Sequence, residues 1–166
     1  MNIFYLNHSE AESAKALCDK HVVKMIVEST QLLCNAYPEN SFPEQYKRTH
    51  YNHPCSIWTR DNIYNFNWLL EYALELCKEY THRYYKVHKC YIFLCYMCSN
   101  LPELSDSSSW TVPPQVMPDE FKVKGNTVKA YRNYYHHKAE TMKSFCYTNR
   151  TPPDWLYSNK VKCKIN

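Results

Sequence analysis

The 166-residue chain contains a single glycine, Gly125, and this scarcity constrains the fold more than any other feature. Sheet-rich folds use glycines in hairpin turns and bulges, so a chain with one glycine favours helices joined by loops of proline, asparagine and serine. The length fits one domain, and hydrophobic residues make up 45% of the chain, enough for a core. We therefore predict an all-α, compact single-domain helical fold with long Pro-rich connecting loops, covering residues 1–157, and a basic C-terminal tail at 158–166.

Apolar residues at a spacing of about 3.6 place the predicted helices. Ser9 and Glu12 have the spacing of a capping box at the start of the first helical stretch, and Ser56 or Asp61 can cap the long middle helix. The predicted helices cover residues 9–36 with a break near Asp19, 56–77, 88–99 and 127–145. Proline-containing loops separate them at residues 38–54 and 101–124. The tail after Tyr157 is predicted to be frayed and carries Lys160, Lys162 and Lys164.

Charge, cysteine content and hydropathy restrict the possible partners and the compartment. The formal net charge is +4, which permits a nucleic-acid partner without requiring one. Nine cysteines is an odd number, and the first residues lack the apolar run of a signal peptide, so free thiols in a reducing compartment are the simpler interpretation. No stretch approaches the roughly 20 apolar residues that span a bilayer. We therefore predict a soluble intracellular protein that makes no membrane contact.

One face of the first long helix carries His21 and Glu28, two helical turns apart, together with Lys24 and close to Asp19. A carboxylate on a largely apolar helix is paired, solvated in a cleft, or held there for acid–base chemistry. Spacing alone leaves a structural salt bridge or a buried hydrogen bond open beside a catalytic role.

The loop before the middle helix and the first turns of that helix gather basic and imidazole side chains: Lys47, Arg48, His50, His53 and Arg60. These side chains can bind phosphate. With Glu28, the two histidines can alternatively ligate a metal ion. A third interpretation is a polar loop in which the step from His53 to Pro54 only shapes the helix start. Because no strict ligand motif is present, we predict no metal ion and no other cofactor.

Two further segments have both a functional and a structural interpretation. Cys95 and Cys98 resemble half of a zinc site, but His88 and Cys90 are too cramped for the other half, and we interpret the segment as a buried helical stripe with apolar thiols. The last helix interleaves tyrosines with Arg132 and Lys138. These residues can follow a phosphate backbone while the tyrosines stack on bases, or the tyrosines can be core residues beside solvated cations. The sequence has no phosphate-binding loop, dinucleotide fingerprint, nucleophile elbow or kinase signature.

Four segments resemble the pyrimidine-dimer DNA glycosylase family, especially small phage and large-virus proteins grouped with it. They are Asp19-Lys-His21 followed by Glu28, His53-Pro54 before a long aromatic helix with Glu79 and Arg83, Tyr131-Arg-Asn-Tyr-Tyr135, and Asn149-Arg-Thr-Pro-Pro-Asp-Trp155. The resemblance implies a DNA-repair glycosylase with an associated lyase activity, whose partner is damaged duplex DNA.

The resemblance also implies a mechanism and a set of site residues. In the family, the N-terminal α-amine attacks the sugar carbon C1′ and forms a Schiff base, and a glutamate assists ring opening and β-elimination. An α-amine suits this role because its ordinary pKa is near neutrality. The family also flips a nucleotide and bends the duplex, so positive charge and aromatic wedges are expected. The implied catalytic residues are Met1, His21 and Glu28. The candidate DNA-binding residues are Lys20, Lys24, Lys47, Arg48, His50, His53, Arg60, Arg132 and Lys138.

The sequence departs from the family pattern in three places. Asn2 follows Met1, and initiator methionine is normally removed only before smaller residues, so the reactive amine is that of Met1 itself. Val27 and Gln31 stand where the family has arginines around the glutamate, and Asn2 or Ile3 stands where it has an N-terminal arginine. Lost arginines weaken phosphate binding, so the substrate can differ. Candidate replacements are Lys20, Lys24, Lys47 and Arg48.

Two other functions stay open from the sequence. One is a non-catalytic nucleic-acid-binding protein on the same fold, and the other is a metal-dependent hydrolase that uses His50, His53 and Glu28. The expected location is intracellular, in the cytoplasm or nucleus of a host cell if the protein is viral.

Overall fold

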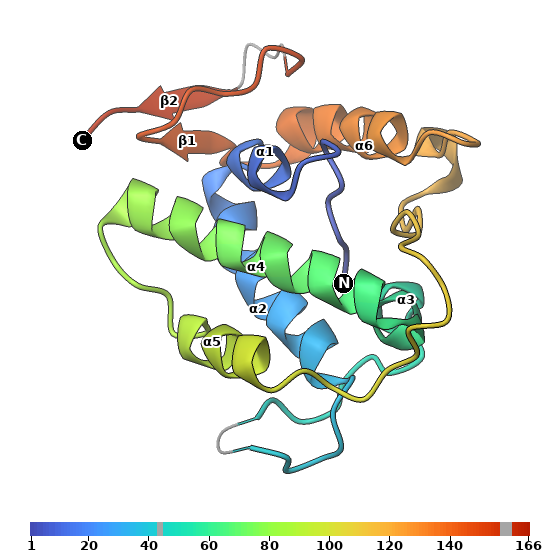
Figure 1. Ribbon diagram of the computed structural model, residues 1–166. Helices are drawn as coiled ribbons and strands as arrows, with labels where there is room; N and C mark the ends of the chain where they lie inside the picture. The colour runs from blue at the N-terminus through green and yellow to red at the C-terminus, as the bar shows by residue number, and fades with distance from the viewer. Residues whose placement is uncertain (43–44, 157–160) are drawn as a thin grey trace.

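The computed structural model describes residues 1–42, 45–156 and 161–166, and it confirms the all-α prediction (Figure 1). Six α-helices, one 3-10 helix and two short strands lie within these residues. In chain order they are α1 (Glu10–Lys15), α2 (Asp19–Cys34), α3 (Pro54–Asp61), α4 (Ile63–Tyr84), α5 (Tyr91–Ser99), the 3-10 helix η1 (Asp119–Phe121), α6 (Thr127–Thr141), β1 (Cys146–Thr148) and β2 (Lys162–Lys164). No helix among the described residues has the length and apolar character needed to cross a membrane.

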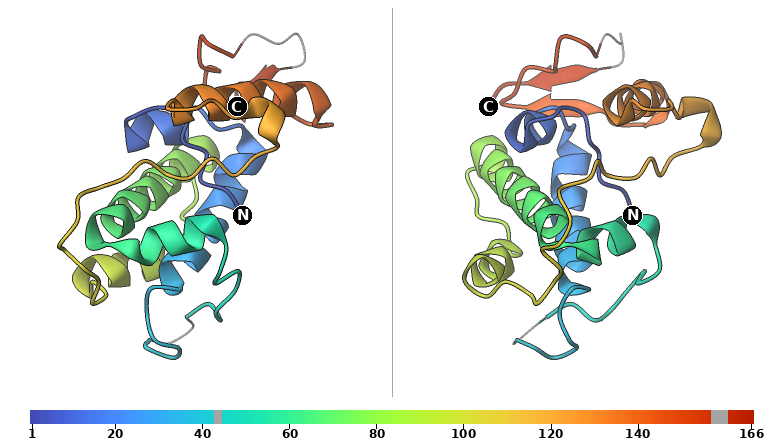
Figure 2. Two further views of the ribbon diagram at one scale, coloured as in Figure 1. Left: turned by 90° about the vertical axis from the view of Figure 1, so that its right-hand side faces the viewer. Right: turned by 45° about the vertical axis from the view of Figure 1, so that its right-hand side comes forward.

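Helices α2 and α4 pack against each other at the centre, and α1, α3 and α5 also contact α4 (Figure 1). Helix α6 and the two strands lie at one end of this pair. The N-terminal segment enters the core, because Ile3, Phe4, Tyr5 and Leu6 are all buried. Both views in Figure 2 show the first residues running away from α1 until the N-terminus lies beside α3. The fold therefore brings the start of the chain to the place where α2 and α3 meet.

The first helical stretch breaks before Asp19, as predicted, but only half of the expected capping box forms. The Ser9 hydroxyl accepts a hydrogen bond from the Glu12 backbone amide at 3.4 Å. The Ser9 amide donates to the side chain of Asn7 at 3.1 Å, and the Glu12 carboxylate instead pairs with Lys15 at 2.8 Å. Asn7 thus takes the role expected of Glu12.

The predicted middle helix is two helices that meet at Asn62, whose extended backbone ends α3 and whose side chain caps α4 by accepting from the Asn65 amide at 2.9 Å. The cap of α3 is His53, followed by Pro54 in the first turn, where a missing N–H costs little. The prediction of Ser56 or Asp61 as a cap is wrong because both residues lie inside α3.

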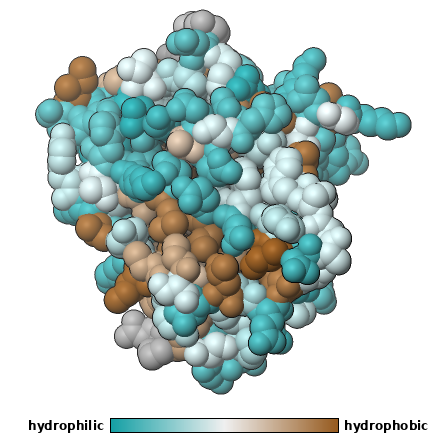
Figure 3. Space-filling view, viewed as in Figure 1, coloured by the Kyte–Doolittle hydropathy of each residue, from teal (hydrophilic) through white to brown (hydrophobic). Residues whose placement is uncertain are grey.

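Two expectations about exposure are also wrong. Residues Lys162–Lys164 are not frayed, because they pair in parallel with Cys146–Thr148, and Asn149 adds a hydrogen bond to the Lys164 carbonyl at 2.7 Å. Lys160 lies outside the described residues. Helix α5 is not a buried stripe, because Ile92 is 69% exposed and Cys95 and Cys98 are exposed as well. Figure 3 shows apolar side chains gathered over this part of the surface.

Candidate active site

The N-terminal segment is hydrogen-bonded to Glu28. The backbone N–H of Asn2 donates to Glu28 Oε2 at 3.3 Å. The other carboxylate oxygen, Oε1, lies 3.2 Å from Nζ of Lys24, one turn earlier on α2, and the Glu28 side chain is 14% exposed. Because Met1 is bonded directly to the residue that contacts Glu28, its α-amine lies in the immediate neighbourhood of a carboxylate that solvent can still reach.

The start of α3 contacts the same segment from the other side. Burial raises the pKa of Cys55 to about 12, although a hydrogen bond from the Ile3 backbone and the nearby N-terminal ammonium both favour the thiolate. Burial also lowers the pKa of His53, and the N-terminal ammonium lowers it further. The Asn2 amide is therefore held by α2, the Ile3 backbone lies against Cys55 of α3, and the terminal ammonium lies within electrostatic range of His53.

His21 lies two turns before Glu28 but faces the core. Its ring is 7% exposed, stacks on Phe4 with 4.7 Å between ring centroids, and places Nδ1 3.0 Å from the hydroxyl of Tyr135. Burial, with smaller contributions from nearby lysines, lowers the pKa of His21 to about 4. The structure thus places a neutral His21 against the N-terminal segment, where it supports Phe4.

The candidate DNA-binding residues form separate groups. Lys20, Lys24 and Lys138 all lie close enough to His21 to lower its pKa, so they form one positively charged region around the first half of α2. Lys138 also lies over the ring of Tyr134, at 4.8 Å from its centroid. Arg132 is directed elsewhere, because its Nε donates to the Leu6 carbonyl at 2.9 Å and its guanidinium packs over an aromatic ring of the C-terminal segment.

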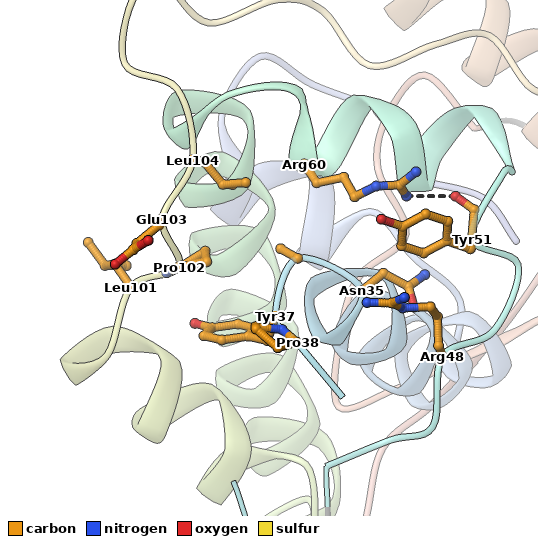
Figure 4. A pocket seen from close by; sticks show the side chains of 11 residues that line it. Asn35, Tyr37, Pro38, Arg48, Tyr51, Arg60, Leu101, Pro102, Glu103 and Leu104 are labelled. Atoms are coloured by element: carbon orange, nitrogen blue, oxygen red, sulfur yellow. Dashed lines mark hydrogen bonds between the residues drawn. The ribbon is translucent and has the colours of Figure 1, made fainter. Parts of the chain in front are cut away.

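A second positively charged group surrounds Tyr51. The guanidinium carbons of Arg60 and Arg48 lie 3.5 Å and 4.5 Å from the ring centroid, and Figure 4 shows them on opposite sides of the ring. Arg60 is fixed further by hydrogen bonds from Nη1 to the Tyr51 carbonyl at 2.6 Å and to the Ser56 hydroxyl at 2.9 Å. Within the described part of the chain neither arginine forms an ion pair, so both charges remain available to an anion.

These two arginines line a cavity of about 780 Å³ (Figure 4). Asn35 and Tyr37 form another part of the wall, and the segment 101–104 closes the far side, where Glu103 is the one acidic group among the lining residues. The Asn35 side chain donates to the Thr49 carbonyl and to the Ser56 hydroxyl, both at 2.8 Å. Since Asn35 caps the C-terminal end of α2 two turns after Glu28, the cavity continues the helix face that carries the carboxylate.

The two histidines of the loop are in different surroundings. His50 is exposed, has a positive φ of 49°, and contacts the Thr49 hydroxyl through Nδ1 at 2.8 Å. His53 is half-buried at the start of α3, and Lys47 is exposed on the loop. No three histidine, cysteine or acidic side chains in the described ranges gather as a metal-binding cluster, so the structure does not bring His50, His53 and Glu28 together in that way.

Sequence reasoning did not single out Tyr51, Cys55 or Asn35. Tyr51 and Cys55 belong to the segment that was already of interest for its histidines and cations, but neither residue type signals phosphate binding by itself. Asn35 follows Glu28 at the same seven-residue interval that separates His21 from Glu28, and that periodicity was the available signal.

A comparison with protein-family models supplies independent evidence. The model described as pyrimidine dimer DNA glycosylase matches residues 1–92 of the chain. The chain belongs to the pyrimidine dimer DNA glycosylase family. The matched part of this DNA-repair glycosylase, whose substrate class is DNA, runs from the N-terminal segment through α4 and includes Glu28, the Tyr51 group and His53. Searches of curated proteins and of solved structures returned no match.

Segments that suggested the glycosylase family meet in one buried ion network. Arg83, fully buried on α4, donates to Asp19 at 2.9 Å and to Glu79 at 2.6 Å. Glu79 accepts from Arg150 at 2.6 Å, and Asp19 also accepts from the amide and hydroxyl of Thr148. Burial alone would raise the pKa of Asp19, but these hydrogen bonds lower it below its usual value. The network fixes the start of α2, the helix that carries His21 and Glu28.

Proposed function

We propose that this member of the glycosylase family removes a damaged, pyrimidine-dimer-like base from duplex DNA and cleaves the resulting abasic site, using the Met1 α-amine as nucleophile and Glu28 as acid and base. The observation that supports the proposal is the hydrogen bond from the Asn2 amide to Glu28 at 3.3 Å. A nucleophile and its acid–base partner must lie within hydrogen-bond reach or one water of each other, and a contact made one residue away from the amine supports this arrangement.

The proposed chemistry needs three proton transfers that one carboxyl group can perform in turn. The unprotonated amine forms a bond to C1′, the damaged base leaves with the electron pair of its glycosidic bond, and the Glu28 carboxylate takes the extra proton from the amine nitrogen. Protonated Glu28 then gives its proton to the ring oxygen O4′, the C1′–O4′ bond breaks, and the amine and C1′ form an iminium. The Glu28 carboxylate, now a base, removes a proton from C2′ and β-elimination follows.

We assign His21 a positioning role in this mechanism. It contacts Phe4 and Tyr135, so it acts on the amine through the N-terminal segment. Lys24 keeps its ion pair with Glu28 but is 63% exposed, so it can exchange the carboxylate for a DNA phosphate.

The proposed DNA-binding surface follows the exposed side of α2 and continues onto the loop before α3. Lys20, Lys24 and Lys138 supply charge near His21, and the Tyr51 group supplies two arginines that have no carboxylate partner among the described residues. Contacts of this kind orient a duplex through its phosphates and carry no base specificity. The remaining candidates are Lys47, His50, His53 and Arg132.

The test is covalent trapping with borohydride, which reduces an iminium to a stable amine. The protein is incubated with ultraviolet-irradiated duplex, or with duplex that carries one abasic site. Peptide mapping then locates the adduct. We expect the DNA on Met1. An adduct on a lysine, or none with either duplex, contradicts the proposal.

Two variants make the test specific. Glu28→Gln still offers an oxygen to the Asn2 amide but cannot transfer protons, and we expect strand cleavage to fall by about 100-fold or more. Glu75→Gln removes the carboxylate of an exposed ion pair with Lys78 on α4 and should leave the rate unchanged. A short extension in front of Met1 should abolish the adduct while leaving thermal unfolding unchanged. DNA binding with no adduct, and no effect of Glu28→Gln, instead identifies a non-catalytic DNA-binding protein.

We also propose that residues 1–157 act as one glycosylase domain with residues 158–166 as its tail, and that the protein works inside a cell, which is a host cell if its source is a virus. Nine unpaired cysteines support a reducing location, since all nine lie in the described part of the chain.

A further inference from the structure

His53 lies beside the proposed nucleophile and has no role in the mechanism so far. The chain begins beside α3 (Figure 2), the helix that His53 caps, and the charges of the N-terminal ammonium and of Glu28 both act on the His53 pKa. His53 is half-buried, and among the described residues its ring has one hydrogen bond, which Nδ1 accepts at the start of the helix that it caps. The ring therefore forms part of the reaction site and still has one nitrogen to offer.

The hydrogen bond at the start of α3 determines which nitrogen that is. Nδ1 accepts from the backbone N–H of Cys55 at 3.2 Å. A neutral imidazole that accepts through one nitrogen carries its proton on the other, so His53 is in the Nε2–H form. Because the two nitrogens lie on different edges of the ring, Nε2–H is directed away from the helix that occupies Nδ1.

A fixed N–H donor beside the amine complements an oxygen that gains negative charge during the reaction. Two sugar oxygens, O4′ and O3′, gain negative charge in the proposed mechanism. O4′ receives its proton from Glu28, whereas O3′ leaves with an electron pair and has no partner in the mechanism above. We propose that His53 is a catalytic residue of the elimination step, in which Nε2–H donates a hydrogen bond to the phosphate that departs from C3′. This role rests on the proposed function.

Atoms and electrons balance in this elimination step. Glu28 takes the C2′ proton, and the C2′–H electron pair forms a C2′–C3′ double bond conjugated with the iminium. The C3′–O3′ bond breaks, and its electron pair leaves on a phosphate monoester that carries one more negative charge than the diester did. His53 gives up no proton. It stabilises the charge that develops on the leaving group, so it accelerates strand cleavage and leaves adduct formation unaffected.

The test separates adduct formation from strand cleavage in single-turnover reactions on a duplex with one abasic site. His53→Asn keeps an oxygen close to the position of Nδ1, and asparagine is a good N-cap, so α3 should stay intact. His53→Asn lacks an N–H at the position of Nε2. We expect borohydride-trapped adduct to form at a rate within about threefold of wild type, and strand cleavage to fall by about 100-fold.

His53→Gln carries an amide N–H near the position of Nε2, and its rate of strand cleavage should be about tenfold higher than that of His53→Asn. His137→Gln, an exposed change on α6, is the matched control and should cleave like wild type.

Several outcomes overturn the role. If His53→Asn cleaves at the wild-type rate, no leaving-group contact exists. If adduct and cleavage fall together while thermal unfolding is unchanged, His53 acts on the amine instead. If His53→Gln cleaves no better than His53→Asn, the N–H is not the active feature. Failure of the wild type to form any adduct is a different result, because it removes the proposed function and this role with it.

Discussion

Acid should destabilise the folded protein through His21, beginning at a higher pH than that at which carboxylates protonate. The ring is buried against Phe4 and Tyr135, and burial lowers its pKa from 6.5 to about 4. The unfolded chain therefore takes up a proton in a pH range where the folded chain excludes it. Protonation in that range favours unfolding, so the free energy of unfolding must fall as the pH falls.

The two pKa values set the size and the limits of the effect. The contribution of His21 to stability is complete above about pH 6.5, is lost progressively down to about pH 4, and changes no further below that value. Each pH unit in the window is worth about 1.4 kcal/mol, so the whole window removes about 3 kcal/mol from the free energy of unfolding. His53 and His88, whose pKa values burial also lowers, contribute in the same direction.

Urea unfolding of wild type and His21→Asn at several pH values between 7.5 and 4 isolates the His21 contribution. Asparagine can keep a polar contact with Tyr135 but does not titrate, so the variant should start less stable and lose about 3 kcal/mol less over the window. Lys47→Gln removes the charge of an exposed lysine that does not act on the His21 pKa and keeps the imidazole, so it should follow the wild-type curve closely. Parallel curves for wild type and His21→Asn would refute the reasoning, because they would show that His21 does not titrate on unfolding.

Three further predictions concern the ion network, the core and the DNA surface. Arg83→Met leaves the partly buried Asp19 without its cation and the buried Glu79 with Arg150 alone, and should cost about 3–5 kcal/mol in urea unfolding, whereas Lys78→Met, which breaks an exposed ion pair, should cost at most about 0.5 kcal/mol. Equal losses would contradict this assignment. Tyr135→Phe removes the hydroxyl that accepts from a buried amide at 2.7 Å and should cost about 1–3 kcal/mol in the same assay. Arg60→Gln should lower the slope of log binding constant against log salt concentration by about 1 if Arg60 contacts a phosphate, and an unchanged slope excludes that contact.

Local sequence signals predicted the helices well where each signal depended only on residues of the helix itself. The periodicity of α2 and α4 and the break before Asp19 needed no knowledge of distant residues. The cap of α3 was harder, because His53 competes with Ser56, and the choice depends on where Pro54 begins the helix. Helix α5 is apolar on every side, so periodicity could not tell which side chains face the core. The strand Lys162–Lys164 has no apolar pattern at all and exists through its pairing with β1.

The sequence predicted which face of α2 carries the candidate site, but it did not predict which residues contact each side chain. Spacing put His21 and Glu28 on one face of α2, yet the two side chains have opposite surroundings, because different residues of the N-terminal segment cover them. Phe4 stacks on His21 and buries it, whereas the Asn2 amide meets Glu28 at an edge that solvent reaches. Helical periodicity describes one element alone, and it cannot tell which part of another segment lies over each turn.

The missing family arginines affect the proposed chemistry and DNA binding differently. Glu28 and Cys55 hold the start of the chain through the backbone amides of Asn2 and Ile3. Backbone contacts do not depend on which side chain stands at those positions, so an arginine there can be lost without moving the amine. What the proposed mechanism loses is a phosphate contact, and we propose that Arg48 and Arg60, which lie on either side of one tyrosine ring, supply it from another element. In the proposed mechanism, sequence change at residues 2 and 3 therefore shifts where the DNA is bound while leaving the position of the nucleophile unchanged.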